Sequence, residues 1–140
     1  MNNTLKIVID TNVFISALIK KDGLTRNIII KSNNIFLFPE YEFQEIYKYK
    51  DDIIRKSGYS EIEFTEAMTS LLNHVRIVSY EEIGDDYNEA CKIMDKIDSG
   101  DAIFVATAIA LDAFIWSNDK DFKRQDKVKV LSTEDMIEPV

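Results

Sequence analysis

Short, almost wholly apolar runs alternate with longer amphipathic stretches along the chain, and this alternation restricts the fold more than any other feature of the sequence. Five runs have the length and composition of strands that are buried on both faces, as in parallel sheets. They cover residues 5–9, 35–38, 75–78, 114–116 and 128–131. Because helical patterns lie between them, we expect an α/β protein with a parallel sheet of about four to five strands, flanked by helices on both faces.

The helical stretches carry start and stop signals. Gly23 and Gly58 follow two of them, and Ser60 with Glu63 has the pattern of a capping box. Ser99 is expected to cap a helix that is apolar nearly all round and therefore central. The expected helices cover residues 12–20, 24–31, 40–56, 60–74, 85–96 and 101–111, with a short terminal helix that starts at residue 132.

The length and composition of the chain suit one compact domain over residues 1–140, because no repeat or change of composition marks a boundary. The net charge of −8 argues against a nucleic-acid partner, since phosphate binding normally needs a basic face. The positive charges are grouped, however, around residues 20–31, 48–56 and 120–129. Bound divalent cations would also offset several negative charges. Overall charge therefore weakens the case for nucleic acid without excluding it.

Cysteine and hydropathy indicate the compartment. The only cysteine, Cys91, excludes a disulfide within the chain, so a reducing, cytoplasmic location is expected. No apolar run approaches the roughly 20 residues that span a bilayer, so we expect no membrane association.

Acidic residues follow the expected strands at places where one crevice could collect them. Asp10 ends the first strand, and Asp119 follows the fourth by three residues. The carboxyl ends of parallel strands share one edge of a sheet, where α/β proteins bind their ligands. Asp98 and Asp101 lie at the start of the apolar helix, where the helix dipole favours a negative charge. Glu45 lies in the helix after the second strand, at the margin of its buried face.

Carboxylates that converge in this way would need a counter-charge. Two unit charges 4 Å apart repel by about 4 kcal/mol at an effective dielectric constant of 20. Such a site must therefore take up protons or cations. Oxygen ligands of this kind suit Mg²⁺ or Mn²⁺, which can activate a water molecule for attack on a phosphodiester.

Several other readings of the sequence are weaker. Any single aspartate is most often a solvated charge or a helix cap. His74 is the only histidine and has no evident partner, so a Ser-His-Asp triad is not indicated. The chain has neither a Walker loop nor a Gly-x-Gly-x-x-Gly motif. A haloacid dehalogenase-like phosphatase with Asp10 as nucleophile would usually carry a second aspartate two residues later, and this chain has Asn12 there.

Taken together, these residues resemble the PIN domain, the nuclease fold of many prokaryotic VapC-type toxins and of several RNA-processing enzymes. The resemblance covers nearly the whole chain. It depends on Val8-Ile9-Asp10-Thr11-Asn12-Val13-Phe14, on Glu45, on Asp98-Ser99-Gly100-Asp101-Ala102 and on Trp116-Ser117-Asn118-Asp119-Lys120-Asp121-Phe122.

The resemblance implies an endoribonuclease that depends on Mg²⁺ or Mn²⁺ and cleaves RNA with metal-activated water. The residues that it implies as catalytic metal ligands are Asp10, Glu45, Asp101 and Asp119, with Asp121 as a further ligand. Thr11, Asn12, Ser117 and Asp98 would orient the ligands or bound water. Asp98 matches an acidic position that only part of the family has.

The resemblance also implies partners. Toxins of this family are blocked by a small antitoxin protein and are commonly homodimers, so we expect both here. A non-catalytic PIN-like module that binds RNA or a protein stays open as an alternative.

Overall fold

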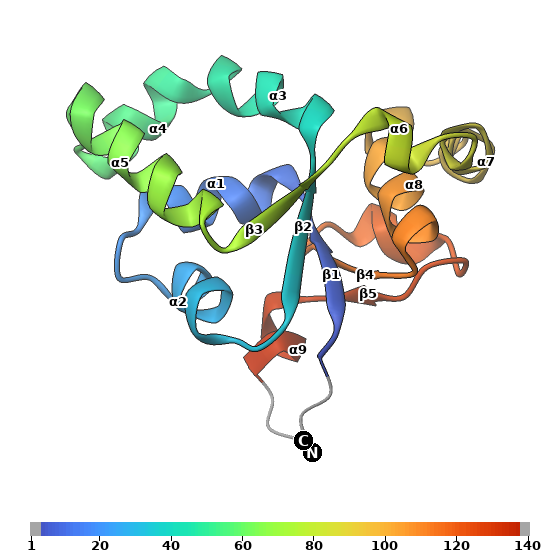
Figure 1. The fold of residues 1–140 in the computed structure, drawn as a ribbon. Coiled ribbons are helices and arrows are strands. Elements are labelled where there is room, and N and C mark those ends of the chain that lie inside the picture. Colours follow the sequence, from blue (N-terminus) through green and yellow to red (C-terminus); the bar gives the residue numbers. More distant parts are fainter. Residues whose placement is uncertain (1–3, 138–140) are drawn as a thin grey trace.

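The computed structural model describes residues 4–137, which contain one five-stranded sheet whose strand pairings are all parallel (Figure 1). The strands lie in the order β3-β2-β1-β4-β5. They are β1 (Lys6–Ile9), β2 (Ile35–Pro39), β3 (Val75–Val78), β4 (Phe114–Trp116) and β5 (Val130–Leu131). The predicted fold class is confirmed. The first and last three residues of the predicted 1–140 domain lie outside the described residues.

The strand order places a crevice at the centre of the sheet. The chain begins at β1, adds β2 and β3 on one side, and then crosses to β4 and β5 on the other. In such sheets, ligands bind outside the carboxyl ends of the strands where the order reverses. The reversal lies between β1 and β4, whose ends pair Ile9 with Trp116. The backbone N–H of Asp10 donates to the carbonyl of Trp116 over 3.3 Å, so both segments leave the sheet side by side.

Helices cover both faces of the sheet. In Figure 1, α1, α2, α4 and α5 gather on one side, and α6, α7 and α8 on the other. The helices of the described residues are α1 (Thr11–Ile19), α2 (Leu24–Lys31), α3 (Phe43–Lys48), α4 (Lys50–Ser57), α5 (Glu61–Leu72), α6 (Tyr80–Ile83), α7 (Asp86–Met94), α8 (Ala102–Leu111) and α9 (Thr133–Ile137), with 3₁₀ turns η1 (Glu40–Glu42), η2 (Ser99–Asp101) and η3 (Lys120–Arg124). Among residues 4–137, no helix combines the length and apolar character needed to cross a bilayer.

Helix α8 is the central helix that its apolar sequence predicts. Its first seven residues are all buried, and it packs on α7 and on β1, β2 and β4. The ring of Phe104 contacts those of Phe38 and Phe122, with centroids 6.3 Å and 6.1 Å apart. Such close packing fixes the position of the helix. Asp101, which immediately precedes α8, is therefore attached to a helix whose first seven residues are all packed in the core.

The predicted single helix over residues 40–56 is wrong, because the structure divides it. A 3₁₀ turn, η1, comes first, α3 then ends at Lys48, and the backbone of Tyr49 leaves the helical region before α4 begins. The interruption leaves two shorter helices, of which α3 follows η1 and α4 makes the larger contact with α1. Both helices thereby bury an isoleucine, Ile46 and Ile53.

Two smaller expectations are corrected. Ser99 does not cap the apolar helix; the side chain of Asp98 instead accepts from the N–H of Gly100 over 3.0 Å, and a 3₁₀ turn precedes α8. The predicted strand over residues 128–131 is reduced to its last two residues. The side-chain amide of Gln125 bonds both the N–H and the carbonyl of Val128, and this contact holds the earlier residues in a turn.

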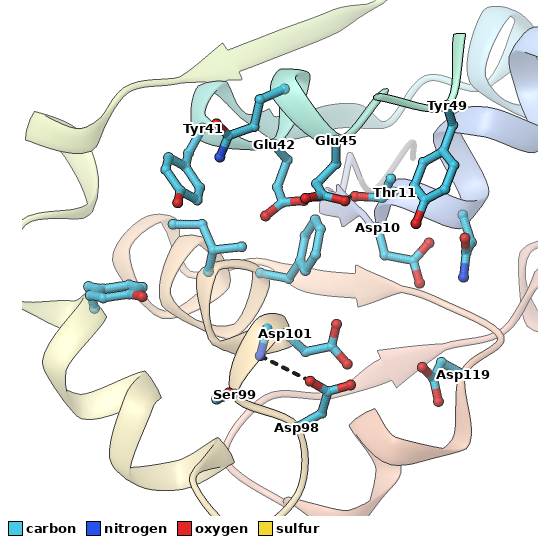
Figure 2. Close-up of a pocket in the computed structure, with 16 residues that line it drawn as sticks. Asp10, Thr11, Tyr41, Glu42, Glu45, Tyr49, Asp98, Ser99, Asp101 and Asp119 are labelled. Atoms are coloured by element: carbon cyan, nitrogen blue, oxygen red, sulfur yellow. Dashed lines mark hydrogen bonds between the residues drawn. The ribbon is translucent and has the colours of Figure 1, made fainter. Parts of the chain in front are cut away.

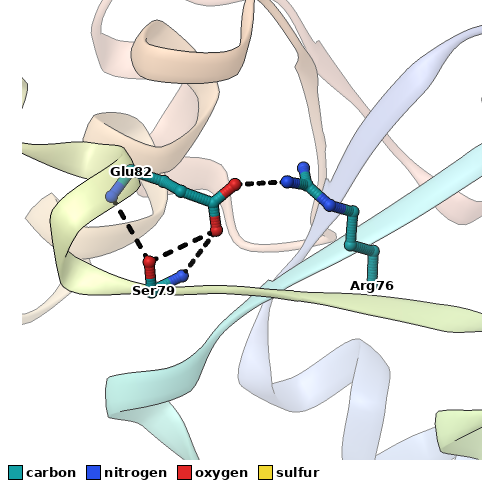
Figure 3. A network of polar contacts seen from close by, with 3 residues as sticks. All are labelled: Arg76, Ser79 and Glu82. Atoms are coloured by element: carbon teal, nitrogen blue, oxygen red, sulfur yellow. Dashed lines mark hydrogen bonds and ion pairs between the residues drawn. The ribbon is translucent and has the colours of Figure 1, made fainter.

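Capping boxes start two of the helices. The predicted one at Ser60 and Glu63 is confirmed, with both reciprocal hydrogen bonds present. A second capping box, which was not predicted, is formed by Ser79 and Glu82 at the start of α6 (Figure 3). The carboxylate of Glu82 also pairs with Arg76 of β3. This network fixes the short helix α6 to the edge of the sheet.

Candidate active site

A cavity of about 590 Å³ opens at the carboxyl ends of the central strands (Figure 2). Its lining contains six carboxylates and, among the described residues, no lysine, arginine or histidine. The six are Asp10, Glu42, Glu45, Asp98, Asp101 and Asp119. None of the ion pairs within residues 4–137 involves any of them. The cavity therefore concentrates negative charge that no protein cation neutralises.

Asp10 lies where β1 meets α1 and is only 4% exposed. Its Oδ1 accepts from the N–H of Val13 over 2.8 Å, which caps α1 and fixes the carboxylate. Burial raises the pKa of Asp10, while polar contacts with Ser117 and the N–H of Val13 partly offset the rise. The charge of Asp119 raises this pKa further. The carboxylate is therefore fixed in position by the cap, while burial and the charge of Asp119 disfavour its ionised form.

Asp101 shows the strongest electrostatic perturbation. Burial is the largest cause, and it acts together with the charges of Asp98, Asp119, Asp10 and Asp121 to raise the pKa of Asp101 to about 7. Its Oδ2 is buried and has no hydrogen-bond partner among the described residues. A buried carboxylate oxygen without a partner costs free energy unless a proton or cation reaches it. This oxygen is the clearest position for such a group.

Asp98 and Asp119 are each fixed by the turn that they start. Oδ1 of Asp98 accepts from the N–H of Gly100, and Oδ1 of Asp119 accepts from the N–H of Asp121 over 2.9 Å. The hydroxyl of Ser117 accepts from the N–H of Asp119 over 3.0 Å. In Asp98 and Asp119, as in Asp10, it is Oδ1 that accepts a hydrogen bond from a backbone N–H nearby in the sequence. Figure 2 shows Asp98, Asp101 and Asp119 on the wall opposite the glutamates.

The other wall carries Glu42 and Glu45, which come from η1 and α3 (Figure 2). Glu45 is half-buried. Glu42, which the sequence analysis missed, is 7% exposed and accepts a hydrogen bond from the Thr11 hydroxyl over 3.1 Å. Burial raises the pKa of Glu42; the bond from Thr11 offsets part of the rise, and the charge of Glu45 adds to it. A usable signal existed, since Glu42 follows β2 by three residues, just as Asp119 follows β4.

The structure brings most of the predicted site residues together. Asp10, Glu45, Asp101 and Asp119 all line the one cavity, as do Thr11, Asn12 and Asp98. Ser117 is buried beneath it and contacts Asp10 and Asp119. Asp121 does not line the cavity. Its Oδ1 lies 3.7 Å from Nη1 of Arg124. The charge of Asp121 nevertheless contributes to the raised pKa of Asp101.

Metal ligation by these residues stays a prediction. Within residues 4–137, no three Asp, Glu, His or Cys side chains lie close enough to hold one ion as they stand. The donor chemistry nevertheless fits a hard divalent cation, because all candidate ligands are carboxylates and one buried oxygen of Asp101 is unpartnered. The walls would have to close slightly around such an ion.

The fold and this crevice define a class of protein: an α/β domain with a parallel sheet and an acidic site at the switch point. A family model described as PIN domain matches residues 8–137, so the chain belongs to the PIN domain family. The resemblance inferred from the sequence is thereby confirmed.

Solved structures support the fold. The chain is similar to a chain in the structure of VapBC2 from Rickettsia felis bound to a DNA fragment from their promoter, with a TM-score of 0.70 and 18% identity over 91% of this chain and 98% of that one. It is also similar to a chain of VapBC-1 from nontypeable Haemophilus influenzae, with a TM-score of 0.62 and 16% identity over 93% and 99% of the two chains. A search of curated protein sequences gave no significant match.

Proposed function

We propose that this protein is a divalent-metal-dependent endoribonuclease that cleaves RNA phosphodiester bonds with metal-activated water. One observation carries the proposal: six carboxylates line a single cavity without a neutralising side chain, and one of them has a buried oxygen without a partner. A site of this kind is stabilised by cations. Membership of the PIN domain family favours nuclease chemistry over other uses of such cations.

The residues that would hold Mg²⁺ or Mn²⁺ are Asp10, Glu45, Asp101 and Asp119, with Asp121 nearby as a further acid. The bound ion would lower the pKa of a water molecule and stabilise the leaving oxygen of the phosphodiester.

The chain's own groups prepare this site before any ligand enters. Asp10 is held by the helix cap to Val13, and Asp119 by the turn that it starts. Thr11 fixes Glu42, which brings a further negative charge to the same wall as Glu45. Ser117 contacts both Asp10 and Asp119 from below. Pre-oriented carboxylates of this kind lose little conformational entropy when an ion binds.

We further propose that the protein is the toxin of a toxin–antitoxin pair, blocked by a small antitoxin and active as a homodimer in the cytoplasm. Both similar solved structures are VapBC assemblies, and the likeness covers almost the full length of the chains compared. Co-expression with the product of a short neighbouring reading frame, followed by co-purification, would test the pairing.

The decisive experiment measures cleavage of a labelled single-stranded RNA with Mg²⁺ or Mn²⁺, with and without a chelator. Asp101→Asn should abolish cleavage. Asp112→Asn is the matched control, because Asp112 is an exposed residue at the opposite end of α8 whose left-handed backbone conformation (φ 53°) asparagine tolerates.

Two outcomes would overturn the proposal. One is cleavage that persists in the chelator or in Asp101→Asn protein purified identically. The other is saturable metal binding with no cleavage of any RNA tested, which would leave a binding module instead.

A further inference from the structure

Exposed tyrosines surround the acidic cavity. Tyr41, Tyr49 and Tyr87 all line it, although 47%, 40% and 40% of their surfaces are exposed. They come from η1, from the junction of α3 and α4, and from α7. Figure 2 shows Tyr41 and Tyr49 at the two ends of the wall that carries Glu42 and Glu45. The rings therefore flank the carboxylates where a long ligand would enter and leave.

A fourth ring extends this surface. Tyr80 of α6 is 50% exposed and lies edge-to-face with Tyr41, with their centroids 5.4 Å apart. We call Tyr41, Tyr49, Tyr80 and Tyr87 the tyrosine rim. Aromatic rings that stay partly in water and gather in one place are typical of binding surfaces, because tyrosine offers a flat apolar face with a polar end.

The charge of the cavity restricts how a polyanion could be held there. Nucleic-acid binding usually draws its affinity from lysine and arginine contacts with phosphates. The described lining of this cavity provides six carboxylates and no such side chain. A positive charge does lie beside the rim, because Nζ of Lys48 is 5.8 Å from the centroid of the Tyr49 ring. Apart from any bound divalent ion, the described lining therefore offers no positive charge to the phosphates of a strand that crosses this cavity, so contacts between the protein and the strand must fall mainly on its other parts.

We propose that the tyrosine rim binds the unpaired bases of single-stranded RNA by stacking, on both sides of the acidic cavity. The inference deepens the proposed nuclease function and rests on it. Every base has an aromatic face, so stacking tolerates any sequence but requires that the base be unpaired. In a duplex the bases are already stacked and paired. The rim thus selects single strands, and the backbone between two stacked bases crosses the carboxylates.

Fluorescence anisotropy with a short, labelled, unstructured RNA tests the proposal, in an Asp10→Asn background so that binding is measured apart from cleavage. Tyr41→Ala, Tyr49→Ala and Tyr87→Ala should each weaken binding by about 10-fold, and the corresponding Tyr→Phe variants should bind as the parent does. Tyr47→Ala is the matched control. Tyr47 is 56% exposed on α3, but its ring contacts Phe64 and does not line the cavity.

Two further probes separate base contacts from backbone contacts. The same strand with abasic positions should bind the parent more weakly, and this difference should shrink in the alanine variants. The same strand annealed to its complement should bind the parent protein more weakly than either single-stranded form does.

Unchanged RNA binding in all three alanine variants, or equal binding of duplex and single-stranded RNA, would overturn the inference. The tyrosine rim would then be interpreted as a binding surface for a protein. Cleavage by the unmodified protein is scored separately. Failure of the nuclease proposal alone would appear as no cleavage together with base-dependent binding.

Discussion

The hydroxyl of Thr11 donates a hydrogen bond to the carboxylate of Glu42 over 3.1 Å, which joins the start of α1 to the turn after β2. The two residues are 31 positions apart in the sequence. Each is close in sequence to a predicted metal ligand, because Thr11 follows Asp10 and Glu42 precedes Glu45 by three residues. The contact therefore connects two of the segments on which the proposed site depends.

We expect Glu42→Gln to weaken Mn²⁺ binding by about 10-fold, because the variant loses a negative charge that lies beside the predicted ligand Glu45. The amide oxygen can still accept from Thr11, so the change removes the negative charge while keeping the hydrogen bond. Isothermal titration calorimetry measures the affinity. Glu40→Gln is the control, because Glu40 belongs to the same turn but is exposed and does not line the cavity. Equal affinities in the two variants would remove Glu42 from the site.

The raised pKa of Asp101 predicts how stability depends on pH without divalent ions. The folded protein keeps a proton on Asp101 up to about pH 7, whereas the unfolded chain releases it near its ordinary pKa of 3.8. The folded state thus binds more protons within this interval, so the free energy of unfolding contributed by this group falls as the pH rises from about 4 to about 7.

Asp101→Asn should abolish this dependence. At about pH 8 the variant should be more stable than the parent by on the order of 2 kcal/mol, since each pKa unit corresponds to about 1.4 kcal/mol and solvent screening reduces the total. Near pH 4 the two proteins should match. Urea unfolding across this range in a chelator measures the difference, and parallel pH profiles would contradict the assignment.

Divalent ions should restore the stability that the carboxylates cost. A ligand that binds only the folded state at 100 times its dissociation constant raises the free energy of unfolding by about 2.7 kcal/mol. Mn²⁺ should therefore raise the melting temperature of the parent and of Asp112→Asn by several degrees, with a much smaller effect on Asp101→Asn. Thermal scans at constant ionic strength measure the shifts. A shift of the same size in Asp101→Asn would place the ion outside the cavity.

The sequence was sufficient to predict the strands of a parallel sheet, though not their order, and the part of the site that the strand ends position. An apolar run that forms a strand and ends in a carboxylate, as at Asp10, places that carboxylate at the strand end. Asp119 follows from the same argument, and the apolar sequence of α8 predicts its central position and hence that of Asp101. These features depend on local sequence and on the geometry of parallel strands.

What the sequence could not predict depends on contacts between distant segments. The position of Glu42 three residues after β2 was a usable signal, but its burial depends on η1 and on the contact with Thr11, which the local sequence does not show. The interruption of the helix at Tyr49 has no local signal either, and the helix that follows it, α4, packs on the distant α1. Asp121 was expected at the site, but the turn capped by Asp119 directs it toward Arg124.

The capping box at Ser79 offers a test that separates stability from binding. Its hydroxyl accepts from the N–H of Glu82, and α6, which it starts, carries Tyr80 of the tyrosine rim. Loss of an N-cap hydroxyl typically costs about 1 kcal/mol. Ser79→Ala should therefore lower the free energy of unfolding by about that amount and also weaken binding of single-stranded RNA, because Tyr80 supports the ring of Tyr41.

Ser60→Ala is the control for this experiment. Ser60 forms the same kind of capping box at the start of α5, a helix that contributes no residue to the lining of the acidic cavity. The same loss of about 1 kcal/mol is expected there, with RNA binding unchanged. Urea unfolding and anisotropy on the two variants give the comparison. If both variants bind RNA as the parent does, α6 does not position the rim; if both lose binding equally, the loss reflects stability alone.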